Sequence, residues 1–200
     1  MAEHIRLFVD FWNFQLEWNN RTQSTKIDWT KLPQVLIHEA IKITSIDNYQ
    51  YDGTRVYASV DLTTRQGGTL KNWLKGFVDR QPGINVLIRE RIPHPKPIYC
   101  KNCDQDISDC PKCGKPFKRA VEKGIDSAII TDMFSLAWEK AYSIAILVTS
   151  DADFVPAVQN LQEKGFKVIN ATWSNIGYQL GGACWATIDI GNIISDLSRA

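Results

Sequence analysis

Short apolar runs alternate with amphipathic stretches along most of this chain, and the alternation predicts strands followed by helices. The run IAILVT at residues 144–149 is rich in Ile and Val and ends at a serine, which is typical of a strand buried on both faces. The pattern predicts strands at 4–10, 55–61, 85–92, 144–150, 167–172 and 186–190, and helices at 33–43, 70–79, 124–138 and 154–164, before a last helical turn. This order indicates an α/β fold with a mostly parallel central sheet covered on both faces.

The alternation stops between residues 93 and 118, where the chain has too few apolar side chains for a core of its own. The sequence CKNCDQDISDCPKC places Cys100, Cys103, Cys110 and Cys113 in a C-x2-C-x6-C-x2-C pattern. Two such turns facing each other supply the four thiolates that Zn²⁺ takes in closed structural sites. We therefore predict a small loop insert stapled by structural Zn²⁺, with an iron–sulfur centre or free or paired thiols as alternatives.

Composition narrows the class of protein. The 200 residues are 44% hydrophobic and 22% charged, which is ordinary for a globular domain, and we expect one domain over 1–200 with the insert 93–118 inside it. No stretch reaches the roughly 20 apolar residues of a membrane span. The first residues also lack the pattern of a signal peptide. We expect a cytoplasmic protein with no membrane partner.

Charge is distributed unevenly. The formal net charge of +1 does not indicate a nucleic-acid binder, but residues 89–123 hold nine Lys or Arg against five Asp or Glu. A basic, rigid insert with Tyr99 and Phe117 can follow a phosphate backbone and stack a base. The alternative, that these charges only solvate a surface insert, is equally open.

Carboxylates stand where the predicted strands end. Asp10 ends the first strand, and Asp151 and Asp153 follow the strand 144–150. In open α/β sheets ligands bind outside the carboxyl ends of the strands, so these acids define a candidate site, although Asp153 alone is also a natural helix N-cap. Asp126 lies in the first turn of the helix predicted at 124–138. Asp132 follows six residues later, about 240° around the helix, and is expected to support the site from outside or to lie on the surface.

If Asp10, Asp126, Asp151 and Asp153 converge, their mutual repulsion requires a cation. Oxygen ligands favour Mg²⁺ or Mn²⁺, which can orient a phosphodiester and activate water. Asn13 adds an amide that can orient a ligand, and the ammonium group of Lys123 can neutralise a phosphate or hold a carboxylate.

Three segments, VDFWNF, KGIDSAIITDM and TSDADFVPAVQNLQEKGFKV, resemble the three motifs of the NYN domain, a PIN-like nuclease family that includes the LabA-like proteins. The resemblance implies a PIN-like three-layer sandwich and metal-dependent endonuclease activity, usually on RNA. It places the family's acidic set, its motif asparagine and its motif lysine on the six residues Asp10, Asp126, Asp151, Asp153, Asn13 and Lys123.

The sequence departs from the family pattern at two places. Phe11 and Trp12 precede Asn13 where a small residue is common, and TSDADF stands where a Ser-Gly-Asp form is frequent. Trp12 either crowds the site or offers a base a stacking face. A phosphatase of the haloacid dehalogenase type and a Toprim-type site fit less well, because they need an Asp in place of Trp12 and a Glu in place of Asp10, respectively.

These features predict a nuclease that cuts single-stranded RNA with Mg²⁺ or Mn²⁺, with substrate contacts from Trp12, Lys115, Lys118, Arg119 and Lys123. The rival interpretation is a weak or inactive PIN-like module that binds RNA or a protein. In that case some of the tryptophans at 18, 29, 73 and 138 line an oligomer interface, although core packing is their commoner use.

Overall fold

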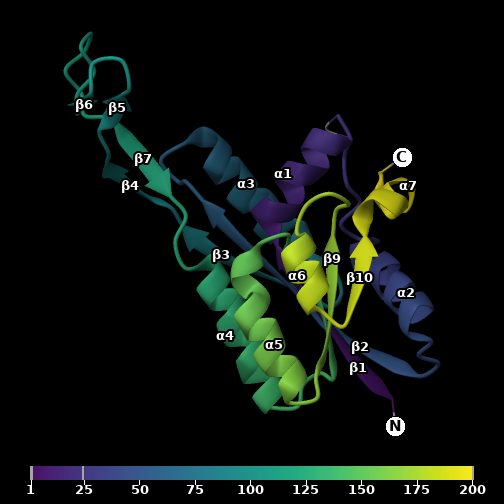
Figure 1. The fold of residues 1–200 in the computed structure, drawn as a ribbon. Helices are drawn as coiled ribbons and strands as arrows, with labels where there is room; N and C mark the ends of the chain where they lie inside the picture. Colours follow the sequence, from purple (N-terminus) through teal and green to yellow (C-terminus); the bar gives the residue numbers. More distant parts are fainter. Residues whose placement is uncertain (1, 24, 200) are drawn as a thin grey trace.

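The computed structural model of the chain describes residues 2–23 and 25–199, and its centre is a six-stranded sheet (Figure 1). The strands run in the order β10-β9-β8-β1-β2-β3, and every neighbouring pair is parallel. Their bounds are Glu3–Asp10 (β1), Tyr49–Val60 (β2), Ile84–Glu90 (β3), Ile144–Val148 (β8), Lys167–Thr172 (β9) and Ala186–Asp189 (β10). The predicted α/β fold with a parallel central sheet is confirmed, and the arrangement is consistent with a PIN-like sandwich.

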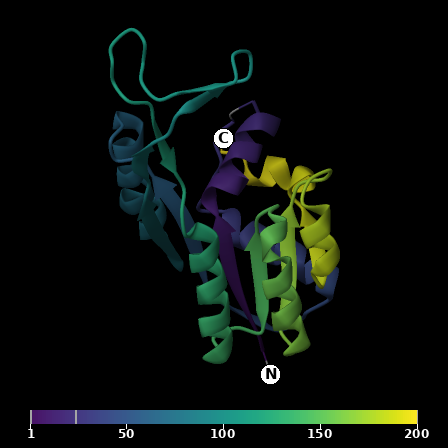
Figure 2. The ribbon, with the colours of Figure 1, turned by 60° about the vertical axis from the view of Figure 1, so that its left-hand side comes forward.

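Helices cover both faces of the sheet and bury two cores. The first face carries α1 (Phe11–Arg21), α2 (Leu32–Thr44), α3 (Arg65–Gly76) and α7 (Ile194–Leu197). The second face carries α4 (Ile125–Trp138), α5 (Val155–Glu163) and α6 (Tyr178–Ala183), and Figure 2 shows α4 and α5 side by side on it. Three 3₁₀ turns, at Val78–Arg80, Ala152–Phe154 and Ile190–Ile193, complete the helical elements named here.

The strand β8 shows why the sheet needs helices on both sides. Ile144, Ile146 and Val148 point into the first core, while Ala145 and Leu147 point into the second, and all five are fully buried. Successive side chains of a strand point to opposite faces, so an unbroken apolar run must be covered twice.

The sequence pattern missed two helices, of which α1 matters more. Its sequence FWNFQLEWNN is rich in aromatic residues and Asn, which have weak helix propensity. The helix is stable here because Phe11, Phe14 and Trp18 are buried against the sheet and the Asp10 side chain caps its first turn. Tertiary burial therefore overrides local propensity.

The four tryptophans that are candidates for an oligomer interface differ in their burial. Trp18 and Trp29 are buried in the first core, which confirms the core-packing alternative for these two, and Trp73 packs against that core while partly exposed. Trp138, at the C-terminal end of α4, is 90% exposed.

The cysteine insert is an arm that stands away from the sheet beyond the end of β3 (Figures 1 and 2). Its stem is an antiparallel pair of β4 (Ile92–Pro95) and β7 (Lys118–Val121), and its tip holds a second pair, β5 (Ile98–Cys100) and β6 (Gln105–Ile107). The predicted strand 85–92 therefore divides into β3 and the start of the stem. The arm is a ribbon of short strands where the sequence predicted an irregular loop. Among the described residues, no helix is long and apolar enough to cross a membrane.

Candidate active site at the carboxyl ends of β1 and β8

The strand order reverses between β1 and β8. From β1 the chain continues to β2 on one side, and from β8 it continues to β9 on the other, while Val9 and Val148 pair directly across the two strands. Such a switch point opens a crevice at the carboxyl ends of the strands. Asp10 ends β1, and Asp151 lies three residues after the end of β8, so the fold brings these two predicted acids to one crevice.

Asp10 is the buried acid of the site. It is 5% exposed, and its side chain caps α1 by accepting a hydrogen bond from the Asn13 backbone N–H at 3.2 Å. The Thr149 hydroxyl donates to its other oxygen at 3.4 Å. Burial raises the pKa of Asp10 to about 6; the bond from Asn13 opposes this shift, and the charges of Glu122 and Asp126 add to it. The site therefore holds an anion at a cost that a cation would relieve.

The charge of Asp126 is coupled to the charges of the other acids. Asp126 lies in the first turn of α4, after Gly124 in the left-handed conformation (φ 78°). Asp126 is exposed as a residue, but the partial burial of its carboxyl raises its pKa, and the charges of Asp151, Glu122 and Asp153 raise it further, in that order. Asp10 is acted on by Asp126 in turn. The four predicted aspartates thus form one electrostatic cluster with Glu122, which we call the acid cluster.

Asp151, rather than Asp153, is the cap after β8. Its Oδ1 accepts a hydrogen bond from the Asp153 backbone N–H at 2.9 Å and begins the turn Ala152–Phe154. The alternative that Asp153 caps this helix is wrong, because the chain makes a 3₁₀ turn before α5 and moves the cap two residues back. Asp153 is exposed.

Asn13 ties the two halves of the site together. Its Oδ1 accepts a hydrogen bond from the Ser150 backbone N–H at 2.8 Å. The Ser150 hydroxyl in turn bonds the Thr172 hydroxyl at 2.8 Å, at the end of β9. The oxygen of the Asn13 amide is therefore engaged by the protein, where it positions the segment that carries Asp151.

A polar network borders the acid cluster on the side of the arm. Arg91 pairs with Glu122 at 2.8 Å, and its Nε donates to the Ser59 hydroxyl at 2.7 Å. Ser59 also contacts the Glu122 carboxylate, and its carbonyl accepts from Trp12 Nε1 at 2.6 Å. The Arg91 guanidinium lies 5.0 Å from the centre of the Trp12 ring. Trp12 is held by this network, and one of its faces is covered by Arg91.

Glu122 is the acid that sequence reasoning missed. The sequence pattern places it only among the charges of residues 89–123, four residues after the predicted end of the insert. Its position directly before the KGID motif, at the point where the arm rejoins the sheet, is the signal that could have placed it beside Asp126.

The remaining predicted residues lie outside the acid cluster. Lys123 is exposed and, within the described residues, makes no ion pair; Lys115 and Lys118 are exposed on the arm. Arg119 lies in β7, but its side chain lies outside the described part of the structure. Asp132 points away from the cluster, as expected, and binds the Tyr57 hydroxyl at 2.7 Å and Arg55 at 2.5 Å.

The donor set of the acid cluster suits a hard cation held partly by water. Within residues 2–23 and 25–199, no three His, Cys, Asp or Glu side chains are arranged around one ion position. Mg²⁺ usually takes only one or two carboxylates and keeps several waters. The oxygen donors and the raised pKa values of Asp10 and Asp126 therefore fit Mg²⁺ or Mn²⁺.

The four insert cysteines form two close pairs. In each pair, backbone N–H groups and the partner thiol lower the pKa of the first cysteine, Cys100 beside Cys103 and Cys110 beside Cys113. Turns that favour thiolates suit a metal. The zinc site itself is not confirmed, because the described structure does not bring three of these thiols around one position.

Comparison with known proteins supports the same class of domain. Residues 109–191 match the model of the NYN domain, which supports the NYN family and a PIN-like, nuclease-type domain. The match includes Asp126, Asp151 and Asp153, whereas Asp10 and Asn13 lie before it. No curated protein matches the chain.

Solved structures resemble the chain over nearly its full length. A protein of unknown function from Vibrio parahaemolyticus is similar over 94% of this chain and 93% of that chain, with a TM-score of 0.59 and 17% identity, and it shows the same fold. The nicotinamidase of Staphylococcus aureus aligns over 98% of this chain and 97% of that chain with 10% identity, but the TM-score of 0.35 is too low to indicate a shared fold.

Proposed function

We propose that this protein is a metal-dependent nuclease that hydrolyses phosphodiester bonds of single-stranded RNA at the acid cluster. The observation that supports the proposal most strongly is the burial of Asp10 at the switch point of the sheet, beside Asp126 and Glu122, with its pKa raised to about 6. Perturbed pKa values of this kind cluster at functional sites, and a bound cation would offset the cost of the buried anion.

Each aspartate has a role that follows from its position. Asp10 and Asp126, the two acids whose pKa values are raised, are the groups that would hold Mg²⁺ or Mn²⁺ most strongly. Asp151 is fixed by its capping bond and completes the ligand set, while exposed Asp153 faces the substrate side. When bound, the metal ion supplies an activated water and neutralises charge on the phosphate.

The surrounding residues position these acids and the substrate. Asn13 and Thr149 fix the relation of Asp10 to the segment after β8 through the bonds described above. Exposed Lys123 lies next to the first turn of α4 and is placed to contact a phosphate. We keep Trp12, Lys115, Lys118 and Arg119 as proposed substrate contacts, with Trp12 acting through the guanidinium that covers it.

The insert is proposed to bind RNA. With structural Zn²⁺ on Cys100, Cys103, Cys110 and Cys113, the tip of the arm becomes one rigid unit that presents basic side chains and the half-exposed ring of Tyr99. A rigid arm beyond β3 can hold a strand that enters the crevice.

A second candidate function is an RNA- or protein-binding module without turnover. It is favoured by the Arg91–Glu122 pair, since a cation of the protein already neutralises one acid of the cluster. It is also favoured by the absence, in the described residues, of a ligand set closed around one ion position.

A cleavage assay separates the two candidates. End-labelled single-stranded RNA and DNA are incubated with the protein and Mn²⁺, Mg²⁺ or a chelator, beside the variant Asp10→Asn. The nuclease proposal expects metal-dependent cutting of RNA that the variant lacks. Intact RNA that remains bound to the wild-type protein in every condition would replace it with the binding module.

A further inference from the structure

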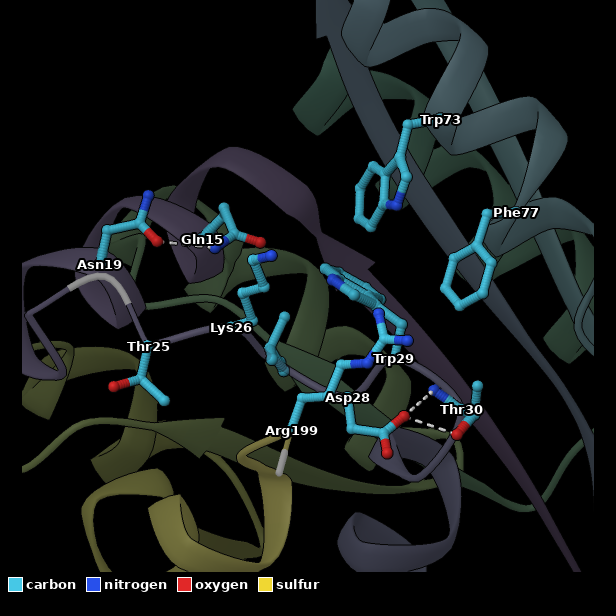
Figure 3. Close-up of a pocket in the computed structure, with 11 residues that line it drawn as sticks. Gln15, Asn19, Thr25, Lys26, Asp28, Trp29, Thr30, Trp73, Phe77 and Arg199 are labelled. Atoms are coloured by element: carbon cyan, nitrogen blue, oxygen red, sulfur yellow. Dashed lines mark hydrogen bonds between the residues drawn. The ribbon is translucent and has the colours of Figure 1, made fainter.

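A second candidate site lies beside α1. It is a pocket of about 530 Å³ between α1, the segment 25–30 and α3 (Figure 3). Trp29 forms its floor, Trp73 and Phe77 come from α3, and Lys26 and Arg199 extend toward it. The volume is typical of sites for small ligands. None of the acid cluster lines it.

The lining combines flat aromatic surface with positive charge. The rings of Trp73 and Phe77 lie 6.2 Å apart at 20°, so they form one nearly continuous aromatic wall that is partly exposed. Within the described chain, neither Lys26 nor Arg199 is in an ion pair. Asp28, the acid of the lining, is bonded to the backbone and hydroxyl of Thr30 and pairs with Lys31 at 3.7 Å. The hydroxyl of Thr30 lowers the pKa of Asp28 most, and the charges of Lys31 and Arg199 add to this shift. Aromatic faces stack bases and unpaired cations bind phosphate.

The floor of the pocket contains an unused hydrogen-bond donor. Trp29 is 1% exposed, and its Nε1–H has no acceptor among the described residues. Buried donors are almost always paired in native proteins, so this donor at the pocket floor calls for an acceptor from a bound water or from a ligand. The edges of nucleobases carry such acceptors.

The pocket and the acid cluster are joined through one aromatic contact. Phe11, the residue after Asp10, stacks on Trp29 with ring centres 5.6 Å apart at 25°. Gln15, which also lines the pocket, follows Asp10 by five residues of α1, or about 7.5 Å along the helix axis. Gln15 of the pocket therefore lies within about one and a half turns of α1 from Asp10.

We propose that this pocket binds one nucleotide of a single-stranded RNA, with its base against Trp73 and Phe77 and its phosphate beside Lys26 and Arg199. The nucleotide lies a short distance along the strand from the phosphodiester at the acid cluster. The proposal deepens the proposed function and rests on it for the identity of the strand.

Base-by-base binding tests the pocket without cleavage. Short labelled RNAs, each with one abasic position, are titrated with the wild-type protein by fluorescence anisotropy, with no Mg²⁺ or Mn²⁺ added. We expect one position, or two neighbouring ones, to lose affinity by about 5- to 150-fold, the usual value of one base–aromatic stack. Trp73→Leu keeps an apolar side chain but has no aromatic face for stacking. In this variant the affinity should no longer depend on which position of the RNA is abasic.

Salt dependence tests the cations independently. The double variant Lys26→Gln/Arg199→Gln should lower the slope of log affinity against log salt by about 0.7, since the two cations share one phosphate and each phosphate contact of a single strand contributes about 0.7. The control Lys140→Gln/Lys164→Gln removes the same amount of charge from exposed residues that follow α4 and α5. These residues lie near the amino ends of the strands, so the control should leave the slope unchanged.

The outcomes separate this proposal from the nuclease proposal. A position-dependent abasic profile in a protein that never cuts RNA would retain the pocket and reject the nuclease. Metal-dependent cutting with a uniform profile and an unchanged slope in the double variant would reject the pocket alone. Full competition by free nucleoside monophosphates, or no RNA binding by the wild-type protein, would also overturn the pocket as a site for the strand.

Discussion

The side-chain oxygen of Asn13 accepts a hydrogen bond of 2.8 Å from the backbone N–H of Ser150. This bond joins the first turn of α1 to the segment after β8, and so fixes the position of Asp10 relative to Asp151. The two acids come from strands that are far apart in sequence, and the asparagine is, with Thr149, a polar link between the segments that carry them.

Removal of this link should disturb catalysis more than binding. Asn13→Ala leaves the Ser150 N–H without its acceptor, which should lower the free energy of unfolding by about 1–3 kcal/mol in a urea titration. RNA cleavage should fall while RNA affinity changes little. Asn20→Ala, on an exposed position of the same helix outside the pocket, is the control. Wild-type turnover in Asn13→Ala would show that the bond does not position the acids.

Asp10 should make the protein less stable as pH rises. Its pKa is about 6 in the folded state and near 4 in the unfolded chain, so the folded state binds the proton more tightly. The free energy of unfolding should therefore fall by up to about 3 kcal/mol between roughly pH 4 and pH 6 and stay low above that range. Asp10→Asn should remove this part of the pH dependence, and urea titrations at several pH values measure it. An identical pH profile in the variant would contradict the assignment.

Glu122 should act on both raised carboxyl groups. Its charge raises the pKa of Asp10 and of Asp126, so Glu122→Gln should lower both values. Mn²⁺ needs the ionised carboxylates, and the pH at which Mn²⁺ binding reaches half its maximum should therefore move down. Calorimetric titration of Mn²⁺ across pH measures this midpoint, with Glu139→Gln, exposed at the end of α4, as the control. An unchanged midpoint in Glu122→Gln would show that the charge of Glu122 does not act on the carboxylates that bind Mn²⁺.

Loss of the zinc site should leave the folding of the central sheet intact. Cys100→Ser together with Cys103→Ser should release one Zn²⁺ per chain, measured by elemental analysis, and weaken RNA binding. The unfolding of the sheet should change little, because these residues are at the tip of the arm, away from both cores (Figure 1). Cys184→Ala, which removes a buried thiol outside the insert, should keep the zinc. A zinc-free wild-type protein would reject the site.

Much of the fold could be predicted from the sequence because its strands are buried on both faces. The apolar runs of β1, β8 and β9 are unambiguous, and strand β9 has the predicted bounds, Lys167–Thr172. Helix α1 could not be predicted from propensity, because its stability comes from the burial of aromatic side chains against the sheet. The strands of the arm were also missed, because they are short and mostly exposed.

The candidate site was predictable where position along a strand decides it. Asp10 and Asp151 follow apolar runs, and parallel strands bring their ends to one edge. The place of Glu122 and of the pocket at Trp29 depends on how the arm rejoins the sheet and on how α1 packs against α3. Such tertiary contacts leave no periodic pattern in the sequence.

The central claim is tested most directly by one matched pair of variants in the cleavage assay. Asp126→Asn and Asp132→Asn make the same change on the same helix, but Asp126 faces the acid cluster while Asp132 is bound to Tyr57 and Arg55. With Mn²⁺ and single-stranded RNA, we expect Asp126→Asn, like Asp151→Asn, to lose turnover by orders of magnitude and Asp132→Asn to retain most of it. Equal turnover in the two variants of α4 would contradict catalysis at the acid cluster.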